Sequence, residues 1–494
     1  MIYHSTRNKN IVVQSSEAII KGISDDGGLF VPEVIPSIDD INILKDMDYK
    51  DLAYEIMGRF LTDFDSEVLK RCIDNAYDDK FLANDIASLV EVDGLFFLEL
   101  YHGPTLAFKD MALSILPYLL KESMKIQGIK EDVVILTATS GDTGKAALEG
   151  FANVDRTKII VFYPKDGVSE IQEKQMITQE GDNTFVVGIK GNFDDAQNGV
   201  KRIFNDDELI GQLKRKNYVL SSANSINIGR LIPQMVYYFH GYLELLRRGK
   251  IKTDEKINIV VPTGNFGNIL AAYYSKLMGL PVKKLVCASN ENKILTDFIN
   301  TGVYDKRRDL ILTSSPSMDI LVSSNLERLL YHLSGEDDSF IENKMRELSQ
   351  NGYYEISNFE TNDFYGGYSN EDEVNESINK LFVNYNYLMD THTAVAYNVY
   401  DKYKIKTQDN SKSIISSTAS AFKFGGAVSS AIGLDINGKD EFSILEDLSK
   451  ASNIRIPKPI KDLKNKEILH KDICDKDDMK MMVKKLLKVG ENNG

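Results

Sequence analysis

The chain has 494 residues, of which 43% are hydrophobic and 27% charged, and its formal net charge at pH 7 is −14. This length predicts two or three domains with room to bury a cofactor, because one hydrophobic core seldom serves so many residues. The acidic balance argues against a nucleic-acid or anionic-membrane partner, since phosphate groups are bound by basic surfaces.

The N-terminus, MIYHSTRNKN, lacks the apolar stretch of a secretory signal. No apolar run approaches the roughly 18 residues that cross a bilayer, so we expect a cytoplasmic location without membrane contact. Cys72, Cys287 and Cys474 are far apart and are interpreted as reduced structural residues. The cysteines and histidines show no metal-ligand spacing, and the sequence therefore predicts no metal site.

The pattern of hydrophobic residues divides the chain into three segments. Residues 1–95 are expected to form a mostly helical lobe, with helical patterns between 49 and 87. Apolar β-branched strands then alternate with helices, as in βαβ units of a parallel sheet. The fold class is therefore predicted to be α/β, with one α/β domain over 96–250 and another over 251–494.

The expected elements follow this alternation along the chain. The predicted strands cover 133–138, 159–163, 185–189, 218–222, 257–261, 285–288 and 413–417. The predicted helices cover 146–151, 170–178, 194–204, 226–247, 267–278 and 393–402. The acidic segment 334–378 is expected to form surface structure or an inserted helical region.

The first segment with chemical potential is HGPTLAFKD, residues 102–110, which contains Lys109. Leu106, Ala107 and Phe108 precede the lysine, and apolar surroundings lower the pKa of an amine. A neutral amine is the form that condenses with an aldehyde. Taken alone, the segment fits better a lysine that extends to solvent from the start of a helix.

Two glycine-containing turns follow predicted strands and precede predicted helices. GNFGN, residues 264–268, suits a phosphate because backbone N–H groups and a helix N-terminus converge there, although a turn without a ligand is the alternative. In TSGDTG, residues 139–144, Ser140, Asp142 and Thr143 either cap the helix or hold a substrate carboxylate or ring hydroxyl. Ligands of open α/β sheets bind at such strand ends.

Three further segments are candidates for binding. In SANSINIGR, residues 222–230, Arg230 offers a planar fork for a phosphate and its neighbours offer neutral donors, or it is a surface arginine on a capped helix. In DTHTA, Asp390 or Thr391 is either functional or only a helix cap. STASAFKF, residues 417–424, could place a hydroxyl against a pyridine nitrogen.

Together these segments resemble one family, the threonine synthases, which are pyridoxal-phosphate enzymes of fold type II. YHSTR and EAIIKGISDDGGLFVPE, between Tyr3 and Glu33, are similar to the family's N-terminal opening. HGPTLAFKD resembles its lysine motif, TSGDTG its substrate-side turn, NSINIGR its central helix start and GNFGN its cofactor-phosphate loop. DTHTAVA and STASAFKF resemble two late motifs, so the resemblance runs in the family's order to about Phe424.

The resemblance implies a tryptophan-synthase-β-like architecture of parallel-sheet domains with an extra N-terminal lobe, and pyridoxal 5'-phosphate as cofactor. Lys109 would be the Schiff-base lysine and the main acid or base. Thr418 would meet the pyridine nitrogen with a neutral hydroxyl, which leaves the ring less protonated than a carboxylate would. The residues that would hold the cofactor phosphate are Gly264, Asn265, Phe266, Gly267 and Asn268.

The implied reaction converts O-phospho-L-homoserine and water into L-threonine and phosphate, a carbon–oxygen lyase reaction that completes threonine biosynthesis. Two phosphates require two anion sites, which favours this reaction over that of a serine or threonine dehydratase. A non-catalytic relative that only binds the cofactor or a partner is the other alternative, and the sequence specifies no oligomeric state. The implied substrate-binding residues are Arg230, Asn224 and Ser225 for the phosphate and Ser140, Asp142 and Thr143 for the amino-acid end.

The sequence departs from the family pattern in three places. Thr391 replaces the proline of DPHTAV, and Ile228 and Gly229 replace an aromatic–alanine pair. Ser420 and Ala421 replace the His-Pro of TAHPAKF, close to the residue expected at the ring nitrogen. The lysine motif and the phosphate loop are unaltered.

Overall fold

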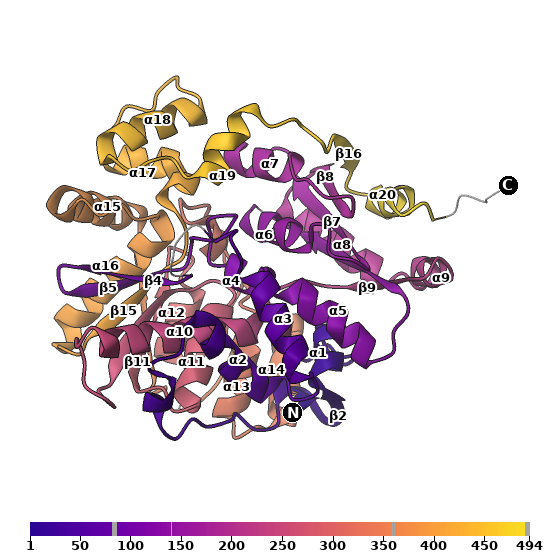
Figure 1. Ribbon diagram of the computed structural model, residues 1–494, viewed down its shortest axis with the longest axis horizontal. Helices are drawn as coiled ribbons and strands as arrows, with labels where there is room; N and C mark the ends of the chain where they lie inside the picture. The colour runs from indigo at the N-terminus through magenta and orange to yellow at the C-terminus, as the bar shows by residue number, and fades with distance from the viewer. Residues whose placement is uncertain (82–85, 140, 358, 360, 490–494) are drawn as a thin grey trace.

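The computed structural model describes residues 1–81, 86–139, 141–357, 359 and 361–489. Two largely parallel sheets with helices around them form the body of the molecule, and a small antiparallel sheet lies near the N-terminus (Figure 1). The predicted α/β class is confirmed.

The N-terminal part combines a small sheet with helices. Strands β1 (Ile2–Ser5), β2 (Asn8–Gln14) and β3 (Phe30–Pro32) pair antiparallel in the order β2-β1-β3, which the sequence did not predict. The expected helices are present as α2 (Tyr49–Phe60) and α3 (Ser66–Ala76), each started by an aspartate cap. The short helices are α1 (Ser15–Lys21) and the 3-10 turn η1 (Ile41–Leu44).

The five-stranded sheet is parallel throughout, in the order β16-β8-β7-β6-β9. Its strands are β6 (Asp132–Ala138), β7 (Thr157–Pro164), β8 (Thr184–Lys190), β9 (Tyr218–Ser221) and β16 (Asp472–Asp475). The accompanying helices are α6 (Asp142–Phe151), α7 (Glu170–Ile177), α8 (Phe193–Phe204), α9 (Asp207–Arg215) and α20 (Met479–Leu486). The first four strands were all predicted; the edge strand β16 was not.

The six-stranded sheet has the order β14-β11-β10-β15-β5-β4, with only β4 antiparallel to its neighbour. Its strands are β4 (Ser88–Val92), β5 (Leu95–Glu99), β10 (Ile257–Pro262), β11 (Val282–Ser289), β14 (Phe364–Tyr368) and β15 (Ser413–Ser417). Strands β10, β11 and β15 were predicted. Strand β15 lies between β10 and β5, and its residues are buried on both faces of the sheet.

The remaining elements precede or surround this sheet. The helices are α4 (Asp110–Leu113), α5 (Leu116–Ile126), α10 (Ile228–Arg247), α11 (Gly267–Leu277), α12 (Ile294–Thr301), α13 (Leu326–Leu333), α14 (Asp338–Asn351), α15 (Glu371–Tyr385), α16 (Thr391–Thr407), α17 (Gly425–Ala431), α18 (Glu441–Ser452) and α19 (Lys458–Lys461). The short pieces are β12 (Val303–Asp305), β13 (Tyr353–Glu355), η2 (Pro316–Met318), η3 (Ala421–Phe424) and η4 (Asp462–Asn465).

Membership of the two sheets crosses both predicted segment boundaries. Strand β4 lies in the first segment and β5 spans its end, yet both belong to the six-stranded sheet. Strand β16, near the C-terminus, belongs to the five-stranded sheet. The division at 95 and 250 stays a prediction of domain organisation.

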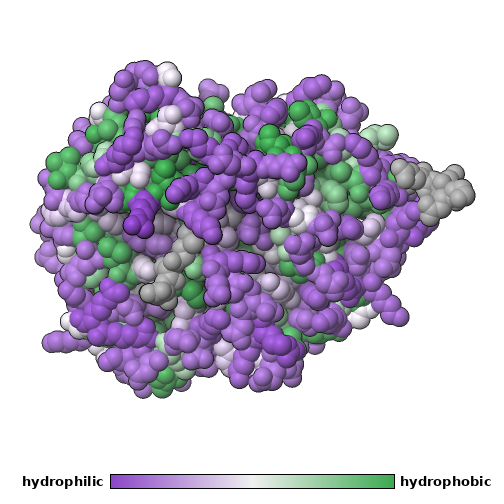
Figure 2. All heavy atoms as spheres, turned by 45° about the horizontal axis from the view of Figure 1, so that its top comes forward, coloured by the Kyte–Doolittle hydropathy of each residue, from purple (hydrophilic) through white to green (hydrophobic). Residues whose placement is uncertain are grey.

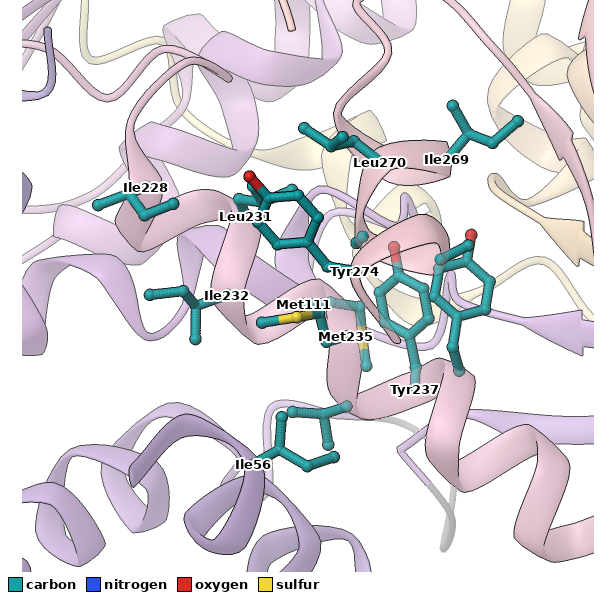
Figure 3. Packing of buried hydrophobic residues seen from close by; sticks show 14 of the residues in the cluster. Ile56, Met111, Ile228, Leu231, Ile232, Met235, Tyr237, Ile269, Leu270 and Tyr274 are labelled. Carbon is teal, nitrogen blue, oxygen red and sulfur yellow. The ribbon is translucent and has the colours of Figure 1, made fainter. Parts of the chain in front are cut away.

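The long helix α10 lies in the centre of the main hydrophobic core (Figure 3). Its residues are buried on nearly every side, and it packs against α2, α4 and α11. Met235 lies among Ile56, Met111 and Tyr274 in the same cluster. Each such fully buried aliphatic side chain contributes roughly 1.5–3 kcal/mol by leaving water, so this helix fixes the position of its own N-terminal residues.

The face of the molecule in Figure 2 is mostly hydrophilic, and hydrophobic residues form small separate patches on it. Among the described residues, no helix combines the length and apolar character that crossing a membrane requires. Cys72, Cys287 and Cys474 are buried and unpaired, as predicted.

Candidate active site

The predicted binding segments meet at the carboxyl ends of strands from both sheets. The turn at 139–144 follows β6, and the segment 222–230 follows β9. The loop at 264–268 follows β10, and Thr418 follows β15 directly. This is the edge at which open α/β sheets bind ligands.

Lys109 lies just before α4, and its residue is only 9% exposed, which excludes the arrangement in which the lysine extends to solvent. Its Nζ donates to Ser317 Oγ at 3.2 Å and lies 3.8 Å from Asp142 Oδ2. Burial lowers the pKa of Lys109 to about 8; the charges of Lys423 and Arg230 act in the same direction, and Asp142 opposes them. At this pKa the amine is about half neutral near pH 8 and mostly neutral above it, and the neutral form is the nucleophile or base.

Asp142 is an ion-pair partner and not a helix cap. Gly141 occupies the N-cap position of α6 without a side-chain bond, and Thr139 Oγ1 accepts from Gly144 N at 2.9 Å instead. Asp142 Oδ1 lies 2.8 Å from Lys423 Nζ, whose side chain is fully buried. Burial would raise the pKa of Asp142, but Lys423 and Lys109 outweigh it and hold that pKa well below its usual range. The carboxylate therefore stays ionised beside the amine.

Of the other two residues predicted in this turn, the structure describes one. Thr143 is half-buried in the first turn of α6. Ser140 lies outside the described residues, so its expected role stays a prediction.

The loop at 264–268 approaches a second loop closely. A Cβ on Gly264 would lie 2.5 Å from the carbonyl oxygen of Ser317, which only glycine avoids. Phe266 has a left-handed backbone with φ of 61° and is the N-cap residue of α11. Non-glycine residues in this conformation carry strain and cluster at functional sites. The loop is thus held in one conformation at the start of a helix.

Asn325 supports this loop from α13. Its Nδ2 donates to Asn265 O at 3.0 Å and to Ser225 O at 3.2 Å, and its backbone N–H also donates to Asn265 O. The fully buried Arg328 donates to Asn325 Oδ1 at 2.5 Å. Asn325 therefore connects the 264–268 loop with the 222–230 segment.

In the side-chain amide of Asn268, which lies in the first turn of α11, the oxygen has hydrogen-bond partners and the nitrogen has none among the described residues. Its Oδ1 accepts hydrogen bonds from the hydroxyls of Tyr237 and Tyr238. Its Nδ2 is buried and has no partner among the described residues. A buried amide donor without a partner is costly unless a ligand accepts from it.

Thr418 is buried beside the lysine segment. Its carbonyl accepts from Phe108 N at 2.8 Å, and its own N–H donates to Thr393 Oγ1 at 3.3 Å. Ala107 and Ala419 form an isolated antiparallel bridge alongside. The structure thus places the predicted ring-nitrogen residue beside the segment that carries the predicted lysine.

Arg230 is 3% exposed and lies in the first turn of α10. It donates from Nη1 to Ala223 O at 3.0 Å, while its buried Nε has no partner among the described residues. Burial lowers the pKa of its guanidinium to about 10, so the group stays charged at neutral pH. A buried cation without a carboxylate partner is suited to an anionic ligand.

The neighbours of Arg230 contribute unequally. Asn227, which is not among the predicted binding residues, caps α10 by accepting from Gly229 N. A Cβ on Gly229 would lie 2.9 Å from Leu116 Cδ1, so an alanine at this departure from the family pattern would require the leucine side chain to shift. Asn224 is exposed, and Ser225 is half-buried against Asn325.

This set of groups fits pyridoxal 5'-phosphate. It provides a buried amine of lowered pKa, a glycine loop at a helix N-terminus, an unpartnered amide donor on Asn268 and a threonine beside the lysine. Arg230 adds a cationic position at which another anion could bind.

Several residues of this site were missed by the sequence reasoning. Ser317, Asn325 and Arg328 lie in no motif that we interpreted, and Lys423 was noticed only as part of STASAFKF. The segment SSPSMDI, residues 314–320, is rich in small and polar residues, which is only a weak signal of a functional loop.

Comparisons with known proteins agree with this geometry. Residues 2–77 match the family described as threonine synthase N terminus, and residues 81–416 match the pyridoxal-phosphate dependent enzyme family. Threonine synthase from Saccharomyces cerevisiae is 35% identical over 490 residues, which cover 92% of this chain and 94% of the yeast protein. The crystal structure of PLP-bound threonine synthase from Brucella melitensis superposes with a TM-score of 0.87 at 34% identity and covers 99% of both chains.

A human protein, threonine synthase-like 1, is 40% identical over 434 residues. The match covers 84% of this chain but only 58% of the human protein, less than two thirds of its length. With matches to both family descriptions and full-length similarity to solved threonine synthases, the chain belongs to the threonine synthase family of pyridoxal-phosphate-dependent enzymes of fold type II.

Proposed function

We propose that this chain is a threonine synthase that converts O-phospho-L-homoserine and water into L-threonine and phosphate. The proposal depends on the buried guanidinium of Arg230, whose Nε has no partner among the described residues. Arg230 is close enough to Lys109 for its charge to help lower the pKa of the amine. The cofactor phosphate already has a candidate site at 264–268, so the unpaired donor on the buried guanidinium of Arg230 calls for a second anion. A substrate γ-phosphate supplies it, whereas serine or threonine would not.

The same chain would hold the cofactor with residues of both sheets. Lys109 would bind it covalently, the 264–268 loop would bind its phosphate with backbone N–H groups, and Thr418 would face the pyridine nitrogen. When bound, pyridoxal 5'-phosphate delocalises the negative charge that develops at the substrate α-carbon.

The side chains then divide the chemical work. The amine of Lys109, neutral above a pH of about 8, would move protons at Cα, Cβ and Cγ as phosphate leaves Cγ and water adds at Cβ. Arg230 would hold the γ-phosphate with charged hydrogen bonds, aided by Asn224 and Ser225. Asp142, fixed by Lys423, would lie at the amino-acid end of the substrate, with Ser140 and Thr143 as further partners of that end.

The amount of product from phosphohomoserine tests the proposal. Purified protein loaded with pyridoxal 5'-phosphate should release threonine and phosphate in equal amounts from O-phospho-L-homoserine. Formation of 2-oxobutyrate from threonine, without phosphate release from phosphohomoserine, would identify a dehydratase and contradict the proposal. We further propose a cytoplasmic location, because no apolar run in the sequence approaches the roughly 18 residues that cross a bilayer.

A further inference from the structure

The loop of residues 313–319 places a hydroxyl against the amine of Lys109, although none of the interpreted motifs includes it. Ser317 Oγ accepts from Lys109 Nζ at 3.2 Å. The same residue's carbonyl oxygen is the atom that a Cβ on Gly264 would strike. The 313–319 loop therefore touches both the lysine and the phosphate loop.

The 313–319 loop is closed upon itself and tied to the end of β11. Asp319 Oδ2 accepts from Thr313 N at 2.9 Å. Asp319 Oδ1 accepts from Asn290 Nδ2 at 2.8 Å and from Asn292 Nδ2 at 3.0 Å. These bonds make the loop a single unit, so that a contact at one point positions the rest.

His392, in the first turn of α16, holds the loop at Ser317. Its Nε2 lies 3.3 Å from Ser317 N and must accept, because a backbone N–H can only donate. Its Nδ1 therefore carries the proton and donates to Asp390 Oδ1 at 2.9 Å. The imidazole ring packs against Phe424, with centroids 4.8 Å apart. One tautomer and one ring orientation are thus specified.

Asp390 connects this arrangement to the other side of the expected cofactor. Its Oδ2 accepts from Thr393 Oγ1, which in turn accepts from Thr418 N. Both carboxylate oxygens are therefore in use, and the residue is fully buried. A single carboxylate fixes both the loop that faces Lys109 and the backbone of Thr418.

Thr391 adds a second bond between α16 and the loop. Its Oγ1 donates to Ser314 O at 2.7 Å. The family pattern has a proline at this position, and proline has no hydroxyl to donate. Thr391 therefore gives this chain a bond to the 313–319 loop that a proline at this position could not make.

We propose that Asp390 and His392 are positioning residues that set the place of Ser317, whose Oγ orients the free amine of Lys109 toward the cofactor aldehyde. The inference rests on the proposed role of Lys109 and is independent of which substrate the enzyme turns over.

The test compares two amide variants of His392 by the rate at which cofactor-stripped, full-length protein captures pyridoxal 5'-phosphate, followed by visible absorbance. Glutamine places its amide near the Nε2 position and can still accept from Ser317 N, whereas asparagine places its amide near Nδ1 and cannot reach it. We expect His392→Asn and Ser317→Ala to slow capture by roughly five- to tenfold, the effect of one lost hydrogen bond. His392→Gln should stay within about twofold of the parent.

Matched variants of His332 control for the loss of any buried imidazole. His332 has a side chain that is only 8% exposed, is bonded to Tyr274 Oη at 2.9 Å and lies 3.8 Å from Glu336, but it is on α13 away from the loop contacts. His332→Asn and His332→Gln should lower the thermal midpoint without separating in capture rate. Equal capture rates for His392→Asn and His392→Gln, with equal thermal midpoints, would overturn the proposal.

Thr391→Pro tests the second bond without disturbing the helix. Thr391 follows the N-cap residue Asp390, and proline is favoured at that first helical position. We expect capture to slow by about two- to threefold while the thermal midpoint is kept, because only a side-chain bond is lost. An unchanged capture rate would contradict the part assigned to Thr391.

Because capture needs no phosphohomoserine, these results are separable from the proposed reaction. The expected order of capture rates together with absent threonine formation would refute the proposed function and leave the positioning role intact.

Discussion

Arg230 and Arg328 are both buried arginines near the candidate site, and burial lowers the pKa of each to about 10. Their hydrogen bonds differ. Arg328 donates to Phe30 O at 2.9 Å, to Asn325 Oδ1 at 2.5 Å and to Ile226 O at 2.6 Å. Arg230 donates to one carbonyl, and its Nε has no partner among the described residues.

The difference separates a structural arginine from a binding one. Arg328 joins β3, the 222–230 segment and the support of the 264–268 loop, so its donors already have acceptors within the chain. Arg230 has a buried donor without an acceptor, which lowers the stability of the fold until an anion binds there. Burial and a lowered pKa are shared by both residues, so the unpartnered donor is the feature that distinguishes them.

Replacing the structural arginine should have the largest effect on stability. Arg328→Met removes the guanidinium donors from three oxygens, and we expect the free energy of unfolding to fall by about 3 kcal/mol or more. Urea denaturation measures this as a lower midpoint with an unchanged slope. Cofactor affinity should fall as well, because Asn325 loses its anchor. A midpoint equal to that of the parent would contradict the structural role of Arg328.

Replacing the binding arginine should act on the substrate and spare the fold. Arg230→Met should raise the KM for O-phospho-L-homoserine roughly 10- to 100-fold, the effect of losing charged hydrogen bonds. Its urea midpoint should stay level or rise, because a buried charge without a partner is removed. A destabilised variant with an unchanged KM would reverse the assignment of the two arginines.

A lysine at position 230 refines the comparison. Lysine keeps the charge but lacks the planar fork, so Arg230→Lys should raise the KM by about tenfold or less. Steady-state phosphate release at several substrate concentrations separates this change from any change in kcat. An effect on kcat alone would argue against a binding role for the guanidinium.

The smallest expected change concerns Lys109, a buried cation with one carboxylate at 3.8 Å. The Asp142 carboxylate raises the pKa of Lys109 against the lowering by burial. Asp142→Asn should therefore move the pH midpoint of cofactor capture below about 8, by about one pH unit. The rate should rise with pH through this midpoint, since the neutral amine reacts. A midpoint displaced upward would contradict the electrostatic account.

The same lowered pKa has a consequence for stability without cofactor. The unfolded lysine binds its proton up to a higher pH than the buried one, so between about 8 and its usual 10.5 the unfolded state holds more protons. Stability contributed through Lys109 should accordingly rise with pH in that window. Lys109→Met should flatten this rise in urea denaturation of the cofactor-free protein, and an identical pH dependence in both proteins would contradict it.

The sequence predicted those parts of the fold that carry a local signal. Strands such as β6 and β10 are rich in β-branched residues, and Lys109, the 264–268 loop and Arg230 lie in recognisable motifs. The edge strand β14, FYGGY, lies in an acidic region with two glycines, and its strand character comes from pairing with β11.

The site residues were missed for the same reason as β14, because they depend on contacts with distant parts of the chain. Ser317 and Arg328 act through contacts with residues far away in the chain, such as Lys109 and Phe30, and one sequence carries no local sign of those contacts. Asp142 illustrates the converse case. Its position at a helix start fitted a cap, and only the buried Lys423 made it an ion-pair partner.

The assignment of the reactive lysine can be measured directly. Protein loaded with pyridoxal 5'-phosphate is reduced with borohydride, digested, and the modified lysine is located by mass spectrometry. We expect the label on Lys109. A label on Lys145 or Lys423, which are also buried lysines, would contradict the assignment on which the proposed function depends.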